Sequence, residues 1–423
     1  MRIRACLVPA ILASIAAACG SGAAVDASSQ SSSEGSGGTG GVITGAGGGP
    51  VAVSASSSGV VSATTSATVG SGGAGGSAAA CPSTPPIEGP GISAPAHQWT
   101  WIPIAGAVCR DGSPTGIGVR LNPGSTKLYV YLEGGGACFN AATCAIALGS
   151  FGQVEFASWA GTVGLTGIFD ATQVANPVQE WNAVYVPYCS GDVHAGDVSG
   201  ASVPGGPAGQ DFLGYENIAL YLQRIVATFP DASQVLLTGI SAGGFGAAFN
   251  YDRVAAAFCP LPVALLDDSG PPMSDAYLAP CLQKQWRGLW NLAGVVPAAC
   301  TACTEPSGGG IVNYVSYLNE RWPKSPKGLI SSTQDAVIST FFGYGTDDCT
   351  ASTPLSGATY AAGLQDLRAN YLAASPLWGT YFVDSITHTY LLGPGFYTTT
   401  VGGEPLTQWV ADLLDGHPGN IGP

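Results

Sequence analysis

Residues 234–258 read QVLLTGISAGGFGAAFNYDRVAAAF, and this stretch decides the fold prediction. An apolar, strand-like run ends at Ile240, a turn of small residues follows, and a helix-like segment comes after Ser241. Gly239, Ser241 and Gly243 form G-x-S-x-G, the pattern of a nucleophile elbow, in which a strained turn exposes a serine hydroxyl above a sheet. This short pattern is weak by itself in a chain with 62 glycines. Its strand–turn–helix setting makes Ser241 the candidate nucleophile, with a tight packing turn as the alternative.

Other apolar runs bounded by turn residues accompany this one. They cover residues 127–135, 183–189, 263–270 and 379–385. The runs are apolar on both faces, which favours buried parallel strands over a half-solvated antiparallel sheet. Helical patterns separate them, and the clearest spans 212–229, with Asp211 as its expected N-cap. The alternation predicts an α/β-hydrolase-like fold, with a mostly parallel central sheet flanked by helices.

Residues 271–330 interrupt the alternation. They contain three cysteines, several prolines and the tryptophans at 286, 290 and 322. We expect this Cys-rich segment to be an insertion that covers the C-terminal edge of the sheet. The C-x-x-C at Cys300 and Cys303 has no companion C-x-x-C or histidine pair, so it predicts disulfides rather than zinc or thiol redox chemistry. The sequence predicts neither a metal nor a cofactor.

The amino-terminal residues have the pattern of an export signal. Two arginines precede an apolar run too short to span a bilayer, which predicts a signal peptide over residues 1–18. The sequence AAAC ending at Cys19 is similar to a bacterial lipoprotein cleavage box, although it also fits an ordinary signal-peptidase site. Cys6 leaves with the signal, so lipidation of Cys19 leaves an even number of cysteines for disulfides. We therefore expect an exported protein, lipidated at Cys19 or secreted.

The rest of the chain divides into two compositional parts. Residues 19–80 are rich in Ser, Gly and Ala and predict a flexible linker, and residues 81–423 have a globular composition. The formal net charge of −14 argues against nucleic acid as a partner. The expected contact with a membrane is through an N-terminal lipid anchor alone.

A serine nucleophile needs a base, and the chain holds four histidines. His388 follows the last strand-like run and lies C-terminal to Ser241, which matches the chain order serine, acid, histidine of an α/β-hydrolase. His194 lies on a loop after an earlier strand. The patterns around His97 and His417 are typical of surface positions. His388 is therefore the candidate base.

A run of three glycines, residues 134–136, ends the first strand-like run. An α/β-hydrolase supplies one oxyanion donor here, beside the amide of the residue after the nucleophile, which is Ala242 in this chain. A phosphate-binding loop is the alternative, but no Lys-Ser/Thr pair follows the glycines. Cys138 and Cys144 close the short loop CFNAATC beside this run, and we expect a disulfide between them.

Five segments resemble the pectin acetylesterases and their animal relatives, the Notum carboxylesterases. The segments are YLEGGGACFN, VYVPYCSGDVHAGD, LLTGISAGGFGAAFNYDRVA, the DDSG segment and THTYLL. The paired GGG-x-C and G-x-SAGG-x-G motifs are quite specific to that family. The resemblance implies an α/β-hydrolase that cleaves acyl esters with a serine, an aspartate and a histidine. Motif by motif, it implies Ser241 as nucleophile, His388 as base, and the amides of Gly135, Gly136 and Ala242 as oxyanion donors.

The resemblance also implies an acid in SSTQDAVI, which makes Asp335 the candidate. Asp347 and Asp348 are the main rivals, because they lie on a loop next to Cys349. An N-cap for the helix-like AVISTFF is the structural alternative for Asp335. Asp267 and Asp268 end the strand after the elbow helix, earlier than the acid usually falls, and are interpreted as structural.

The substrate is less well defined than the chemistry. We expect a serine carboxylesterase that removes short acyl groups, acetyl above all, from polysaccharides, with small esters as further substrates. The alternatives are a lipase-like or polyester-cleaving hydrolase and a non-catalytic carbohydrate-binding surface lipoprotein. Plant and animal members have an aromatic residue after the third glycine, where this chain has Ala137. We therefore expect an acyl pocket of a different shape.

Overall fold

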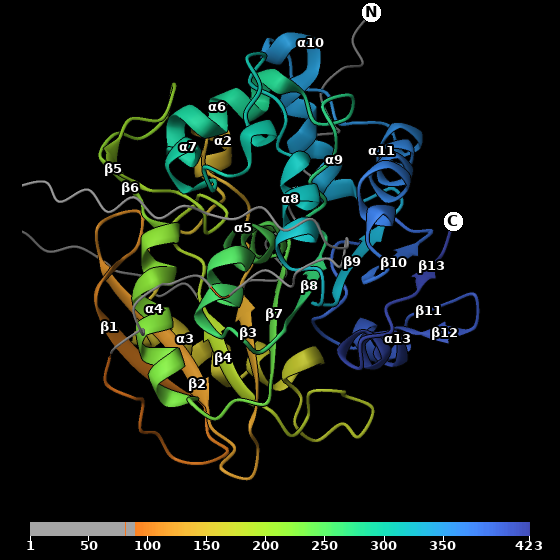
Figure 1. Cartoon of the computed structure of the whole chain (residues 1–423). Coiled ribbons are helices and arrows are strands. Elements are labelled where there is room, and N and C mark those ends of the chain that lie inside the picture. Colours follow the sequence, from red (N-terminus) through yellow and green to blue (C-terminus); the bar gives the residue numbers. More distant parts are fainter. Residues whose placement is uncertain (1–80, 82–88) are drawn as a thin grey trace, which may run out of the picture. The chain divides into compact units, whose positions relative to one another are not determined.

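The computed structural model describes Cys81 and residues 89–423 (Figure 1). The predicted signal peptide, the lipidation site at Cys19 and the linker of residues 19–80 lie outside the described residues. Within the described residues, no helix combines the length and apolar character needed to cross a bilayer.

A nine-stranded sheet forms the centre of the domain, in the order β1-β2-β4-β3-β7-β8-β9-β10-β13. Its strands are β1 (Thr100–Val108), β2 (Pro114–Arg120), β3 (Lys127–Leu132), β4 (Asn182–Val186), β7 (Gln234–Ile240), β8 (Val263–Asp268), β9 (Lys327–Ser332), β10 (Trp378–Val383) and β13 (Asn420–Ile421). β1, β2 and β4 pair antiparallel, and every pairing from β4 to β13 is parallel. The predicted mostly parallel sheet is confirmed.

The inner strands are buried on both faces, as their continuous apolar runs predict. On β3, Leu128 and Val130 face one core, and Tyr129 and Tyr131 face the other. Helices α4 (Gly214–Thr228) and α5 (Ala242–Ala257) contribute to the first core. Helices α3 (Gln153–Ala160) and α13 (Leu406–Leu414) contribute to the second. The sheet therefore lies between two helical layers.

Helix α4 corrects one local prediction. It begins at Gly214, after the N-cap residue Leu213, and the Asp192 carboxylate accepts the Gly214 amide at 2.7 Å. Asp211, the expected N-cap, instead lies in β6 (Gln210–Phe212), which pairs with β5 (Val198–Ala201). Its carboxylate accepts hydrogen bonds from Ser199 Oγ at 2.6 Å and the Gly200 amide at 2.9 Å. The N-cap prediction was wrong because this hairpin takes the carboxylate.

The remaining elements connect the strands and cover the sheet. The helices are α2 (Ala141–Cys144), α6 (Pro280–Trp290), α7 (Leu292–Val295), α8 (Asn313–Arg321), α9 (Ala336–Phe342), α10 (Thr346–Cys349), α11 (Gly357–Asn370) and α12 (Gly395–Thr398). Single 3-10 turns are η1 (Val163–Leu165), η2 (Gly167–Phe169), η3 (Thr301–Cys303), η4 (Gly343–Gly345) and η5 (Leu372–Ala374). Strands β11 (Thr400–Val401) and β12 (Glu404–Pro405) form a small ribbon.

The expected Cys-rich insertion lies between β8 and β9 and consists of α6, α7, η3 and α8. Figure 1 shows α6, α7, α9 and α10 gathered at one end of the domain. A disulfide between Cys281 and Cys349 joins α6 to α10, and a second links Cys300 to Cys303. Three more disulfides join Cys81 to Cys259, Cys109 to Cys189, and Cys138 to Cys144.

Candidate active site

The turn between β7 and α5 presents Ser241 with a strained backbone. Its φ of 55° and ψ of −122° are unfavourable for a residue with a side chain, as expected of a nucleophile elbow. The turn packs tightly against the end of β3: a Cβ on Gly243 would lie 2.0 Å from the carbonyl oxygen of Leu132. Only glycine fits there. The Ser241 side chain lines a pocket, and its amide donates to the Asp268 carbonyl oxygen at 2.7 Å.

Asp335 and His388 form a hydrogen-bonded pair. His388 Nδ1 lies 2.7 Å from Asp335 Oδ2, and the aspartate is fully buried. The other oxygen, Oδ1, accepts the amides of Val337 and Ile338, each at 2.9 Å, and so caps α9. The acid and N-cap interpretations of Asp335 are therefore compatible. A carboxylate on Nδ1 holds the imidazole in the tautomer whose Nε2 can accept a proton.

The rival acids Asp347 and Asp348 are exposed in α10.

Ser241 and His388 share no hydrogen bond within the described residues, and such bonds are often long in ligand-free enzymes. The backbones at Ser241 and just after His388 instead form hydrogen bonds to Asp268, at the end of β8. Its carbonyl oxygen binds the Ser241 amide, and its carboxylate binds the backbone just after His388.

The predicted oxyanion donors divide into two groups. Gly136 and Ala242 line the same pocket as Ser241. Ala242 is the first residue of α5, where amides have no intrahelical partner and the helix dipole favours negative charge. Gly136 has a φ of 81°, a conformation that favours glycine. Gly135 does not line this pocket, and a Cβ on it would lie 3.0 Å from the Tyr188 ring.

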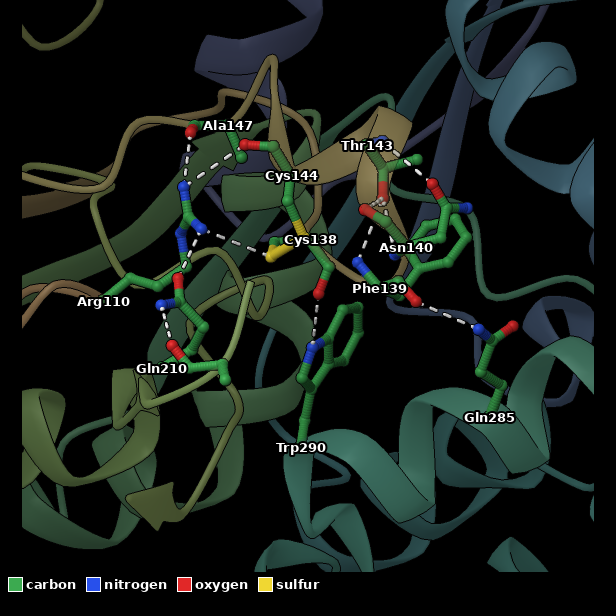
Figure 2. Close-up of a disulfide and its surroundings, with 11 residues drawn as sticks. Arg110, Cys138, Phe139, Asn140, Thr143, Cys144, Ala147, Gln210, Gln285 and Trp290 are labelled. Atoms are coloured by element: carbon green, nitrogen blue, oxygen red, sulfur yellow. Dashed lines mark hydrogen bonds between the residues drawn. A yellow bond between two sulfur atoms is a disulfide. The ribbon is translucent and has the colours of Figure 1, made fainter. Parts of the chain in front are cut away.

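The disulfide between Cys138 and Cys144 fastens the loop after the glycines (Figure 2). Arg110 reaches this loop from the turn after β1: its guanidinium donates to the carbonyl oxygens of Cys144 at 3.3 Å and Ala147 at 2.8 Å. On the other side, the Trp290 indole donates to the Cys138 carbonyl oxygen at 3.1 Å. Sequence analysis did not identify Arg110 in this role, because its partners lie 34 and 37 residues away.

His194 supports the strand end before the glycines. Its Nε2 lies 2.9 Å from the carbonyl oxygen of Glu133, so the neutral ring donates there. Burial lowers the pKa of His194 to about 4 and raises the pKa of Glu133 to about 7. The Glu133 carboxyl accepts the Tyr188 amide at 3.1 Å. His194 is thus committed to a backbone contact, which leaves His388 as the histidine paired with a carboxylate.

An apolar pocket opens beside Ser241. Its walls come from the glycine loop, α5, the insertion and α9. The lining residues are Gly136, Ala137, Val193, Ser241, Ala242, Phe245, Phe249, Pro272, Leu278, Trp286, Trp290, Leu292, Ile311, Ile338, Phe341 and Phe342. The sequence placed the tryptophans in an insertion but did not predict that they form a pocket wall. The arrangement combines a hydroxyl, free amides and an apolar chamber.

Residues 96–314 match the family model described as Pectinacetylesterase. Palmitoleoyl-protein carboxylesterase notum2 of Xenopus laevis is 38% identical over 152 residues, which cover 35% of this chain and 30% of the relative. The human palmitoleoyl-protein carboxylesterase NOTUM is 37% identical over 155 residues, covering 35% and 29%. The alignments thus span less than a third of these relatives.

A solved structure described as the Wnt deacylase Notum from Drosophila is similar to this chain with a TM-score of 0.55. The match covers 77% of this chain and 95% of that one, at 20% sequence identity. This likeness confirms the α/β-hydrolase-like fold.

Proposed function

The chain belongs to the pectinacetylesterase family, and we propose that it is a serine carboxylesterase whose pocket accepts acyl chains longer than acetyl. The observation that carries the proposal is the apolar pocket that opens directly beside Ser241 at the strained elbow. The hydrogen bond between buried Asp335 and half-buried His388 supports the same chemistry.

The reaction has two halves. Ser241 Oγ attacks the ester carbonyl carbon while His388 Nε2 takes the hydroxyl proton, and the amides of Gly136 and Ala242 stabilise the resulting oxyanion. The intermediate collapses as the imidazolium returns its proton to the departing alcohol, leaving an acyl group on Ser241. His388 then deprotonates a water molecule that attacks the acyl-enzyme, and the imidazolium returns this proton to Ser241 Oγ as the ester bond breaks and the acid leaves. Asp335 stabilises the imidazolium in both halves.

The pocket supports a longer acyl chain than the acetyl group expected from sequence. An acetyl group presents one methyl to the pocket, whereas a longer chain also reaches the aromatic walls of α5, α6 and α9. Each buried methylene contributes about 0.8 kcal/mol, which is about fourfold in kcat/KM per carbon. The Xenopus laevis and human relatives are palmitoleoyl-protein carboxylesterases, which agrees with a longer acyl chain.

The alcohol half of the ester lies outside the apolar pocket in this proposal. The ester can therefore be that of a polysaccharide hydroxyl or of a small alcohol. The five disulfides favour an oxidising compartment, and we propose an exported enzyme. Lipid on Cys19 is the proposed means of membrane attachment.

A series of p-nitrophenyl esters from acetate to decanoate tests the proposal. We expect kcat/KM to rise about 15-fold per two carbons until the pocket is full, and Ser241→Ala to abolish turnover of every ester. A maximum at acetate, together with acetate release from acetylated polysaccharide, would instead support the short-acyl polysaccharide esterase. Absence of turnover at every length would favour the non-catalytic alternative.

A further inference from the structure

Asp268 joins the two halves of the proposed catalytic machinery. It is the last residue of β8 and is completely buried. Its Oδ2 accepts the backbone amides of Tyr390 at 2.7 Å and Leu391 at 2.8 Å, and its Oδ1 accepts the Ser269 hydroxyl at 2.9 Å. Its own carbonyl oxygen accepts the Ser241 amide at 2.7 Å. One residue therefore fastens both the elbow and the segment after His388.

These contacts complement the pair of Asp335 and His388. Asp335 orients the imidazole ring, and Ser332 Oγ holds the backbone before it by donating to the Thr387 carbonyl oxygen at 2.6 Å. Asp268 fastens that backbone two and three residues after His388, and the same residue also holds the amide of Ser241. Asp268 lies at the end of a central strand, whose backbone is held by its neighbours in the sheet. The backbones that carry both reacting groups are therefore hydrogen-bonded to the same well-ordered residue.

We propose that Asp268 is a positioning residue that sets the distance between Ser241 Oγ and the imidazole of His388. The proposal rests on the serine carboxylesterase function proposed above. A displacement of about 1 Å between reacting groups can cost roughly 100-fold in rate, so this anchoring matters for turnover.

The charge of Asp268 adds a second effect. Burial raises its pKa to about 6, while the amides of Tyr390 and Leu391 and the Ser269 hydroxyl favour its charged form, so it is ionised at neutral pH. It interacts favourably with the charged form of His388. Other groups around it are the Tyr131 and Tyr390 hydroxyls and the Asp267 carboxyl. The imidazolium formed during catalysis therefore faces a second buried carboxylate besides Asp335.

The neighbouring Asp267 provides a matched control. It is equally buried on the same strand, and its Oδ1 accepts the Gly270 amide at 2.8 Å. Burial raises its pKa well above the ordinary value. The variant Asp267→Asn thus changes a buried carboxyl that accepts the Gly270 amide, whereas Asp268→Asn changes the one that accepts the amides of Tyr390 and Leu391 after His388.

The test compares Asp268→Asn, Asp268→Ala and Asp267→Asn in full-length protein, with kcat and KM measured on p-nitrophenyl octanoate from pH 5 to 9. Asparagine keeps an oxygen for the two amides, so we expect kcat to fall about tenfold with KM unchanged. The acid limb of its kcat/KM profile should move to lower pH, because the imidazolium loses a stabilising charge. Alanine also frees the loop, and kcat should fall roughly 100-fold.

Asp267→Asn should retain the wild-type kcat. The proposal is overturned if Asp268→Asn retains wild-type kcat and an unshifted pH profile, or if Asp267→Asn loses as much. Thermal melts identify an unfolded Asp268→Ala variant, in which case Asp268→Asn decides. If the wild type cleaves no ester, the proposed function fails instead. The labelling rate of Ser241 by a fluorophosphonate then decides whether Asp268→Asn slows the nucleophile.

Discussion

Replacing Asp335 by asparagine separates the two tasks of this side chain. In the wild type, Oδ2 binds His388 Nδ1, and Oδ1 accepts the amides of Val337 and Ile338 at the start of α9. Asparagine has one oxygen and one NH₂ group, so it can preserve only one of these contacts. The expected outcome depends on which contact the amide oxygen keeps.

The energies favour the helix cap. If the amide oxygen faced His388, the NH₂ group would oppose two backbone amides, and the lost cap alone costs about 1 kcal/mol. We therefore expect the oxygen to stay on Val337 and Ile338 and the NH₂ group to face His388 Nδ1. That orientation stabilises the wrong tautomer, which lowers turnover by roughly 10⁴-fold, or about 5 kcal/mol.

The assay is steady-state hydrolysis of p-nitrophenyl octanoate beside a urea unfolding curve. Asp335→Asn should retain its unfolding free energy within about 1 kcal/mol and its KM, while kcat collapses. Asp384→Asn is the matched control, because Asp384 is exposed and binds only Thr333 and Gln334 in the described structure. Turnover above a tenth of the wild-type value in Asp335→Asn would refute the reasoning. A loss of turnover in Asp347→Asn would instead assign the role of the catalytic acid to α10.

Three further predictions concern the nucleophile, the pocket and a buried acid. Ser241→Ala should lower turnover on the order of 10⁶-fold with an almost unchanged melting temperature, and a tenth of the activity left would contradict the elbow. Ala137→Trp places an indole in the pocket, so kcat/KM for octanoate should fall at least about tenfold relative to acetate; equal losses for both esters would argue against an acyl pocket. Burial raises the pKa of Glu133 to about 7, so the folded protein keeps a proton that the unfolded chain releases above its ordinary value of 4.5. Stability from this group therefore falls between pH 4.5 and 7, and the unfolding free energy of Glu133→Gln should gain on the wild type across that range; a constant difference would contradict the shift.

Local chemistry made much of the fold and part of the site predictable. The G-x-S-x-G turn can be recognised from sequence because close contacts require its glycines. These contacts lie within the strand–turn–helix unit and with one neighbouring strand, as the position of Gly243 against Leu132 illustrates. Continuous apolar runs predicted the parallel strands because both faces of a covered sheet are dry. Cys138 and Cys144 lie six residues apart, close enough for their pairing to be expected from spacing alone.

The tertiary structure decided what depends on contacts between distant segments. Asp335 and His388 are 53 residues apart, and Asp268 meets Tyr390 across 122 residues, so no local pattern could bring these groups together. Asp211 fitted the local rule for an N-cap, but the pairing of β5 and β6 claimed its carboxylate. The pocket beside Ser241 exists only where α5, the insertion and α9 converge. Sequence determines which groups are available, and packing determines which of them meet, because hydrogen bonds and apolar burial act over a few ångströms in space regardless of separation along the chain.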